Sequence, residues 1–182
     1  MNSSYLTFTN KRVLVVGDVM LDKYWHGGTS RISPEAPVQV VKVSTEENRA
    51  GGAANVALGL AKLGVAVTLI GVVGNDEHAS ALEKCLEDSG VDCHFIRSQH
   101  SPTITKLRVI SRQQQLIRVD FEESLAQFEH AQAVHSLVET HIQSCDAAIF
   151  SDYAKGTLSG IADLISLANQ YKVPSFVDPK GN

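Results

Sequence analysis

The stretch Arg49-Ala50-Gly51-Gly52-Ala53-Ala54-Asn55 decides the fold, and the helical pattern Val56-Ala57-Leu58-Gly59-Leu60-Ala61-Lys62-Leu63-Gly64 continues from it. Two adjacent glycines before a helix of small residues let the backbone approach a ligand without an intervening Cβ atom. The first N–H groups of such a helix have no intrahelical partner and point outward. Asn55 would lie one turn inside the helix, where its amide both donates and accepts hydrogen bonds, as the recognition of sugar hydroxyls requires.

Two interpretations of this stretch remain open at the level of sequence. In the first, Gly51, Gly52 and Asn55 form a seat for a polar or anionic small molecule. In the second, the glycines make a tight turn and the helix simply packs closely on a sheet. The rest of the chain has to decide between them.

The composition is that of an ordinary globular protein and excludes several classes of function. The 182 residues suit one domain with a sizeable core, with 43% hydrophobic and 20% charged residues. A formal net charge of −4 and a pI near 5.9 argue against a nucleic-acid partner. The chain has neither an 18-residue apolar run nor an N-terminal signal, so we expect no membrane partner and a cytoplasmic location.

The cysteines and histidines do not form a metal-binding pattern. Cys85, Cys93 and Cys145 are odd in number and lack the C-x-x-C spacing, which argues against a disulfide framework and a zinc site. The histidines are scattered, without the i, i+4 spacing that places two ligands on one helical face. We therefore expect no metal site built from these residues.

Polar residues follow the buried strands that the apolar runs predict. The run 11–17 is nearly continuous and ends in glycine, which is typical of a strand buried on both faces of a parallel sheet. Asp18 and Asp22 come next, at the sheet edge where open α/β proteins bind their ligands. A turn or helix cap is the alternative role for Asp18. A G-x-G-x-x-G fingerprint is absent, which argues against a dinucleotide cofactor.

Later runs repeat this arrangement. Strands are expected at 65–71, 92–96, 146–150 and 173–177, and the last two precede Ser151-Asp152-Tyr153 and Asp178-Pro179-Lys180. Helices are expected at 77–88 with Gly90 as C-cap, at 123–143, and from a cap at Thr157 or Ser159 to about Tyr171. The order of elements predicts an α/β fold with a mostly parallel sheet flanked by helices.

A second, smaller sheet is expected from two segments that alternate polar and apolar residues. Residues 27–37 form a loop rich in turn formers before a half-exposed strand at 38–43, and residues 103–121 form an antiparallel hairpin. Together they would make a small β lid. Lys106 and Arg108 share one face of a hairpin strand. Two interpretations of this basic pair remain open: it forms part of an anion pocket, or both charges are simply solvated on the strand surface.

Several motifs resemble the N-terminal part of the ribokinase family of sugar kinases. They are the Gly-Asp-x-x-x-Asp strand end at 17–22, the Gly-Gly-Ala-Ala-Asn helix start at 51–55 and the Asp-Pro-Lys segment at 178–180. The segments 30–38, 102–108, 114–118 and 151–156 are most similar to family members that phosphorylate a heptose 7-phosphate. The resemblance extends from about Val13 to Gly181.

The resemblance implies a ribokinase-like fold of which residues 1–182 form only the N-terminal, substrate-side part, with the lid at about 38–43 and 103–121. The implied reaction is the ATP-dependent phosphorylation of D-glycero-β-D-manno-heptose 7-phosphate at O1, which supplies ADP-heptose and lipopolysaccharide core synthesis. It implies ATP and Mg²⁺ as cofactors, a small sugar phosphate as ligand, and a homodimer formed through the lid.

The resemblance also implies a role for each site residue. Sugar hydroxyls would be bound by Asp18, Asp22, Gly51, Gly52 and Asn55. Lys106 and Arg108 would bind the 7-phosphate through charge-assisted hydrogen bonds. Asp152 would face the sugar, and Lys180 would lie nearer the phosphoryl-transfer side.

The chain departs from the family pattern in one respect. The family's Gly-Ala-Gly-Asp segment, which provides an anion hole and the catalytic base, does not occur in these residues. We therefore expect no catalytic residue in this chain and no phosphoryl transfer by it alone. Two alternatives remain: a kinase of the same fold for another sugar or a nucleoside, and a non-catalytic module for sugar-phosphate binding or dimerisation.

Overall fold

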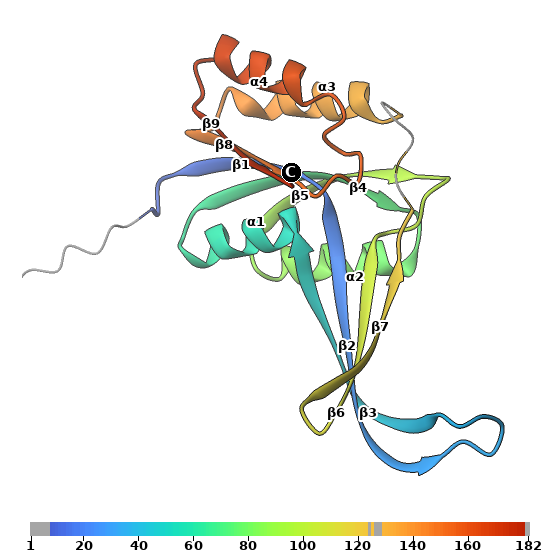
Figure 1. The fold of residues 1–182 in the computed structure, drawn as a ribbon. Coiled ribbons are helices and arrows are strands. Elements are labelled where there is room, and N and C mark those ends of the chain that lie inside the picture. The colour runs from blue at the N-terminus through green and yellow to red at the C-terminus, as the bar shows by residue number, and fades with distance from the viewer. Residues whose placement is uncertain (1–7, 124, 126–128, 181–182) are drawn as a thin grey trace, which may run out of the picture.

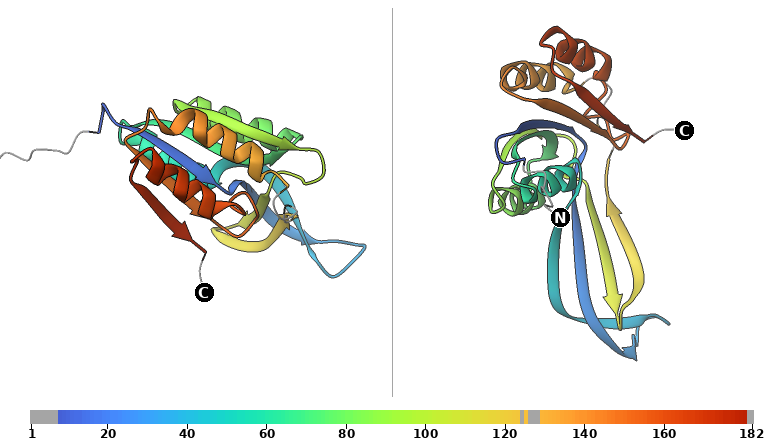
Figure 2. Two further views of the ribbon diagram at one scale, coloured as in Figure 1. Left: turned by 90° about the horizontal axis from the view of Figure 1, so that it is seen from above. Right: turned by 90° about the vertical axis from the view of Figure 1, so that its left-hand side faces the viewer.

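A computed structural model of the chain describes residues 8–123, 125 and 129–180 (Figures 1 and 2). The elements in chain order are β1 (Arg12–Gly17), β2 (Val19–Ile32), β3 (Gln39–Gly52), α1 (Ala53–Lys62), β4 (Ala66–Gly74), α2 (Glu77–Glu87), β5 (Val91–Ser98), β6 (Thr105–Ser111), β7 (Gln114–Phe121), α3 (Ala131–Ile142), β8 (Ala147–Asp152), α4 (Ile161–Gln170) and β9 (Ser175–Pro179). They form two sheets.

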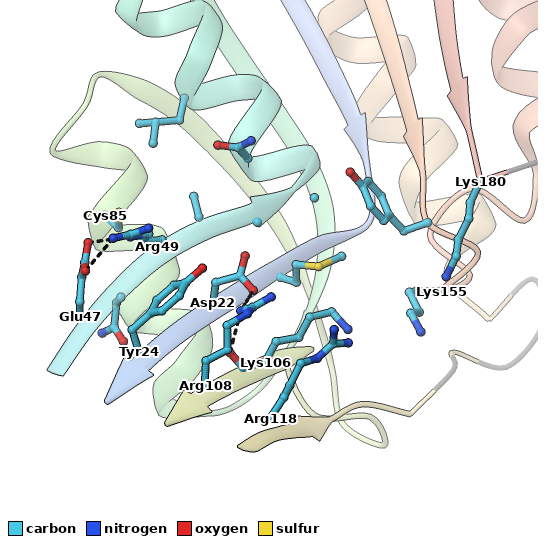
Figure 3. Close-up of a pocket in the computed structure, with 18 of the residues that line it drawn as sticks. Asp22, Tyr24, Glu47, Arg49, Cys85, Lys106, Arg108, Arg118, Lys155 and Lys180 are labelled. Atoms are coloured by element: carbon cyan, nitrogen blue, oxygen red, sulfur yellow. Dashed lines mark hydrogen bonds and ion pairs between the residues drawn. The ribbon is translucent and has the colours of Figure 1, made fainter. Parts of the chain in front are cut away.

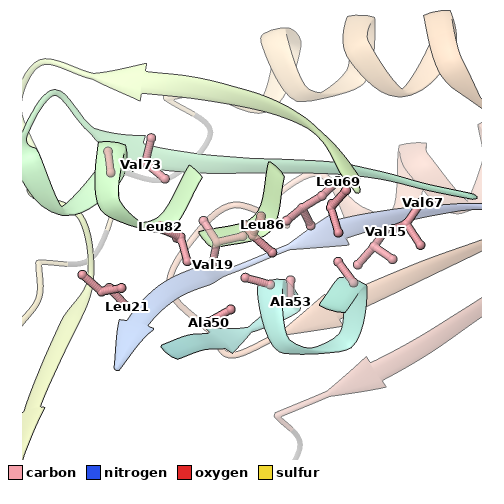
Figure 4. Packing of buried hydrophobic residues seen from close by; sticks show 14 of the residues in the cluster. Val15, Val19, Leu21, Ala50, Ala53, Val67, Leu69, Val73, Leu82 and Leu86 are labelled. Atoms are coloured by element: carbon pink, nitrogen blue, oxygen red, sulfur yellow. The ribbon is translucent and has the colours of Figure 1, made fainter. Parts of the chain in front are cut away.

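The first sheet is parallel throughout and has the strand order β5-β4-β1-β8-β9. Helices α1 and α2 cover one face and α3 and α4 the other (Figure 1). Alternate residues of the central strands enter two cores, so that Val15 and Leu69 pack toward α1 and α2 (Figure 4), while Leu14 and Phe150 pack toward α3 and α4. The predicted α/β fold with a mostly parallel, helix-flanked sheet is confirmed.

The second sheet has the strand order β3-β2-β6-β7 and extends away from the first (Figure 1). Its β2–β6 pair is parallel, whereas β2–β3 and β6–β7 are antiparallel. The predicted hairpin is confirmed, and its turn has Arg112 and Gln113 at positive φ. The second sheet is therefore larger than the predicted pair of segments, because β2 lies between the hairpin and β3.

The loop predicted at 27–37 is wrong for its first residues, because β2 continues to Ile32. The pairing of β2 with β3 runs from Val19 opposite Gly52 to Ile32 opposite Gln39. Register shifts after His26 and after Thr29 accommodate the turn-forming residues. Such bulges let a strand continue through residues that would otherwise favour a turn.

The helix predicted at 123–143 begins later than expected, at Ala131. Glu123 and Leu125 are not helical, and residues 124 and 126–128 lie outside the described part of the chain. The backbone N–H of Leu125 donates to the carbonyl oxygen of Lys155 at 3.1 Å. This long-range hydrogen bond joins the segment before α3 to the loop after β8.

The predicted cap of the last helix is also wrong, while the predicted glycine just past the end of α2 is confirmed. Helix α4 begins at Ile161, and its N-cap residue is Gly160, which has no side chain that could cap the helix. The backbone N–H of Thr157 instead donates to the Asp18 carboxylate. The C-cap residue itself is Asp88, and Gly90, two residues later, has the positive φ of 78° that is typical of a glycine just past a helix end.

Gly17 gives a first prediction, because the backbone of β8 leaves no room for a side chain there. A Cβ atom at Gly17 would lie 2.1 Å from the carbonyl oxygen of Ser151. We expect Gly17→Ala to lower the free energy of unfolding by roughly 1–3 kcal/mol or more. Urea denaturation followed by circular dichroism would measure the change.

Gly59→Ala is the matched control. Gly59 lies within α1, and a Cβ atom there would meet nothing within 4 Å. We expect this variant to be stabilised by about 0.5–1 kcal/mol, because alanine loses less backbone entropy in a helix. A Gly17→Ala variant as stable as the unmodified protein would contradict the close approach of the two strands.

Candidate functional site

A large pocket lies between the second sheet and the carboxyl ends of β8 and β9 (Figure 3). Its volume is about 820 Å³, which suits a small ligand. The lining residues are Met20, Asp22, Tyr24, Glu47, Asn48, Arg49, Ala50, Gly51, Gly52, Asn55, Leu58, Lys62, Cys85, Lys106, Arg108, Arg118, Tyr153, Lys155 and Lys180. Most of the charged ones are cations, although the whole chain carries a formal net charge of −4.

The structure brings most of the predicted site residues together in this pocket. Those that line it are Asp22, Gly51, Gly52, Asn55, Lys106, Arg108 and Lys180. They come from β2, β3, α1, β6 and the end of β9, which are far apart in the sequence. Asp18 and Asp152 are not among the lining residues.

Asp18 is buried and organises the loop that follows β8. Its side chain is occupied by three backbone N–H groups: Oδ2 accepts from Tyr153 at 2.8 Å and from Lys155 at 3.0 Å, and Oδ1 accepts from Thr157 at 3.1 Å. The residue is 1% exposed. Its oxygens thus hold the loop, and the contact between Asp18 and sugar hydroxyls stays a prediction.

Asp152 has a similar local role. Its Oδ1 accepts the backbone N–H of Ala154 at 2.7 Å, and Ala154 has φ 55°. The side chain thus stabilises a turn in which a non-glycine residue has a left-handed conformation. The structure places the predicted sugar-facing carboxylate in this turn rather than in the pocket wall.

The two glycines of the Gly-Gly pair are both required by close packing. A Cβ atom at Gly51 would lie 2.6 Å from Oδ2 of Asp22, and one at Gly52 would lie 2.3 Å from the carbonyl oxygen of Asp18. Gly52 also has φ 57°. Close packing alone therefore explains the glycines, and their place in the pocket wall is an additional observation.

Tyr24 lies beside two guanidinium groups on the second sheet. The Arg49 guanidinium is 4.5 Å from the ring centroid and that of Arg108 is 5.2 Å away, both within the range of cation–π attraction. Arg108 Nη1 donates to Asp22 Oδ1 at 2.6 Å, and Arg49 binds Glu47 with two hydrogen bonds. These contacts fix both arginines against the pocket wall (Figure 3).

A second group of charges joins the second sheet to the loop after β8. Lys106 Nζ donates to Asp120 at 3.4 Å and to Glu122 at 3.0 Å, and Lys155 Nζ donates to Glu122 at 2.8 Å. Arg118 binds Asp120 with two hydrogen bonds, which lower the pKa of that carboxyl to about 2. Hydrogen bonds from Lys155 and Lys106 lower the pKa of Glu122, so both carboxyls are ionised at neutral pH.

Sequence reasoning missed seven of the charged or aromatic lining residues. They are Tyr24, Glu47, Arg49, Lys62, Arg118, Tyr153 and Lys155. The signal for Arg118 was present, because it pairs directly with Arg108 across the hairpin and therefore lies on the same face. Tyr24 was missed because the strand character of β2 was not recognised.

Two further observations bear on metal and membrane binding. Within residues 8–123, 125 and 129–180, no three His, Cys, Asp or Glu side chains lie close enough together to hold a metal ion. Across the same ranges, no helix combines the length and apolar character needed to cross a membrane.

The fold and the site define a class of protein: an α/β protein whose second sheet and parallel-strand ends enclose a cationic pocket for a small molecule. The chain belongs to the pfkB family of carbohydrate kinases, whose family model matches residues 10–182. The predicted ribokinase-like family and fold are therefore confirmed.

Bacterial proteins named bifunctional protein HldE are similar to this chain over almost all of its length. That of Marinomonas sp. (strain MWYL1) is 69% identical over 182 residues, which is 100% of this chain and 38% of the relative. That of Escherichia coli (strain ATCC 8739) is 53% identical over 174 residues, which is 96% of this chain and 36% of the relative. The chain thus spans little more than a third of the length of these relatives.

Solved structures support the fold at low sequence identity. A carbohydrate kinase from Agrobacterium tumefaciens superimposes with a TM-score of 0.71 at 19% identity, covering 92% of this chain and 53% of that one. A possible 1-phosphofructokinase from Thermotoga maritima gives a TM-score of 0.70 at 18% identity over the same shares. At this identity the likeness establishes the fold alone.

The buried role of Asp18 gives the second prediction. Asp18→Ala leaves three backbone N–H groups without their acceptor, and each unsatisfied buried donor costs about 1–3 kcal/mol. We expect the free energy of unfolding to fall by roughly 3 kcal/mol or more. Asp152→Ala, which removes one hydrogen bond in the same loop, should lower it by less than about 1.5 kcal/mol. Equal losses in urea unfolding would contradict the assignment.

Proposed function

We propose that the protein carrying this chain is an ATP-dependent kinase that phosphorylates D-glycero-β-D-manno-heptose 7-phosphate at O1, and that this chain forms its substrate side. The observation that carries the proposal is the cationic pocket in a chain of negative net charge. The 69% identity with a protein named HldE supports it. The 1,7-bisphosphate product would serve ADP-heptose and lipopolysaccharide core synthesis in the cytoplasm.

In this proposal the cations of β6 bind the 7-phosphate. Lys106 and Arg108 project from alternate positions of β6 into the pocket, and Arg118 lies opposite Arg108 on β7. Guanidinium and ammonium groups bind phosphate through charge-assisted hydrogen bonds. Asp22 and Asn55 line the same pocket and would bind sugar hydroxyls, with Gly51 and Gly52 allowing close approach.

Lys180 suits the nucleotide side. It lines the pocket just after β9, and it would hold transferring phosphate oxygens. ATP would supply the phosphoryl group, and Mg²⁺ would neutralise part of its charge. The catalytic base would lie outside these 182 residues, so we expect this chain alone to bind sugar phosphate without transferring phosphate.

Two alternatives are separated from this proposal by the ligand. A kinase of the same fold for another sugar or a nucleoside would make no use of Lys106 and Arg108 if its substrate lacked a phosphate. A non-catalytic module would bind the sugar phosphate in a whole protein that releases no ADP. Titration with phosphorylated and unphosphorylated heptose, combined with an assay for ADP release, distinguishes all three.

Arg108 gives the third prediction. A hydrogen bond to a charged group contributes about 1.5–3 kcal/mol, so Arg108→Ala should weaken the binding of heptose 7-phosphate about tenfold or more. The affinity for unphosphorylated heptose should change little. Isothermal titration calorimetry with the two sugars would measure both effects.

Lys42→Ala is the control for this experiment. Lys42 is an exposed cation on β3, outside the pocket lining, and its replacement removes the same charge from the same sheet. We expect it to leave both affinities unchanged. A loss of the same size for both sugars in Arg108→Ala would argue against a phosphate contact.

We also propose that the second sheet acts as a lid and mediates a homodimer. One face of its hairpin carries Val109, Ile117, Val119 and Phe121, and the last three are exposed. Strands β3 and β7 form the edges of the sheet. An apolar face between two edges is covered efficiently by a second copy related by twofold symmetry.

Ile117 gives the fourth prediction. Its side chain is 54% exposed on this face, so Ile117→Asp should convert the dimer to a monomer at tens of micromolar, on the order of concentrations used for light scattering. Leu63, the C-cap residue of α1, is 60% exposed outside the second sheet, and Leu63→Asp should remain dimeric. A monomeric unmodified protein, or equal behaviour of the two variants, would contradict the proposed interface.

A further inference from the structure

Glu122 follows β7 and connects two separate parts of the pocket wall. Its Oε2 accepts a hydrogen bond from Lys106 of β6 at 3.0 Å, and its Oε1 accepts one from Lys155 of the loop after β8 at 2.8 Å. The side chains of Lys106 and Lys155 are 14% and 16% exposed. Both lysines line the pocket, and Figure 3 shows Lys106 directed toward the side where Lys155 lies.

The way Glu122 is bound resembles the way a phosphate is bound. Each of its two oxygens takes one ammonium donor, and the donors come from different elements of the fold. A phosphate group also presents several oxygens to separate cationic donors, with similar hydrogen-bond lengths. The two lysines are therefore already held at a spacing that one small oxyanion bridges.

A ligand phosphate would have to replace carboxylates that already pair with the pocket cations. Asp120 and Glu122 together neutralise most of the charge of Lys106, Arg118 and Lys155. A monoanionic carboxylate attached to the chain competes with any free anion for the same donors. A dianionic phosphate is the better partner for two ammonium groups, whereas a neutral hydroxyl gains little from them.

We propose that Glu122 is an internal counter-ion that a ligand phosphate displaces from Lys106 and Lys155. Glu122 thereby lowers the affinity of the pocket for anions and restricts that part of it to strongly charged groups. Lys106 belongs to the second sheet, and Lys155 belongs to the loop after β8 of the first sheet. A phosphate bound to both lysines would therefore connect the two sheets in place of Glu122. The inference rests on the proposed function only in assigning that phosphate to a sugar.

The decisive variant is Glu122→Gln, which removes the charge and keeps the size of the side chain. We expect it to bind inorganic phosphate roughly threefold to tenfold more tightly than the unmodified protein, since the partly exposed ion pairs of Glu122 contribute only a modest free energy. Glu46→Gln is the matched control, because Glu46 is an exposed carboxylate on β3, and the change removes the same charge. It should leave the affinity unchanged.

A second variant shows whether the gain acts through Lys155. In a Lys155→Gln background, the added Glu122→Gln change should tighten phosphate binding much less than it does alone, because one displaced contact is already gone. A purely structural role of Glu122 would produce no gain in either background. Phosphate binding that is unchanged, weaker or undetectable in Glu122→Gln would overturn the proposal.

Heptose 7-phosphate separates this inference from the proposed function. If Glu122→Gln binds inorganic phosphate more tightly but heptose 7-phosphate binds no better than phosphate itself, the counter-ion is supported and the proposed substrate is wrong. If the unmodified protein binds heptose 7-phosphate tightly and Glu122→Gln brings no gain for either ligand, the substrate is supported and the counter-ion is refuted.

Discussion

The candidate site depends on the hydrogen bonds of Asp18. Its carboxylate gathers three backbone N–H groups of residues 153–157, its own N–H donates to the carbonyl oxygen of Ser151 at 3.1 Å, and its carbonyl oxygen accepts the N–H of Ala53 at 2.9 Å. One buried residue thus joins the end of β1, the loop after β8 and the first turn of α1. Lys155 reaches the pocket because this loop is fixed. A carboxylate is well suited to the task, since its two oxygens accept several hydrogen bonds at once.

The same residue is the link between the two sheets. Strand β1 ends at Gly17 and β2 begins at Val19, so the chain passes from the parallel core into the second sheet without a loop. Asp22 and Tyr24 are therefore positioned by the rigid core although they lie on the projecting sheet. Residues on rigid strands are positioned more precisely than residues on long loops. The direct continuation of β1 into β2 therefore positions Asp22 and Tyr24 in the pocket wall.

Periodicity in the sequence predicted the parallel strands, the hairpin and the shared face of Lys106 and Arg108, because these features depend on local alternation and on burial. The strand at 27–32 was not predictable in this way, since its glycines, serine and threonine favour turns and only the pairing with β3 overrides them. Leu125, which the periodicity placed in a helix, instead bonds to Lys155, and a partner so distant in sequence is not visible in a local pattern. For Asp18, position predicted a polar site at the strand end, but spacing does not reveal whether a carboxylate faces a ligand or its own backbone.

The pocket also illustrates how a folded protein can hold many like charges close together before a ligand binds. Unpaired ammonium and guanidinium groups that are mostly shielded from water would repel one another and raise the free energy of the folded state. Here Arg108 faces Asp22, Arg118 faces Asp120, and Glu122 lies between two lysines. These carboxylates make the cationic wall compatible with folding, but each one also competes with the ligand. A ligand binds in such a pocket only by replacing carboxylates as the partners of the cations. This exchange favours ligand groups that carry more charge than a carboxylate and present oxygens in several directions.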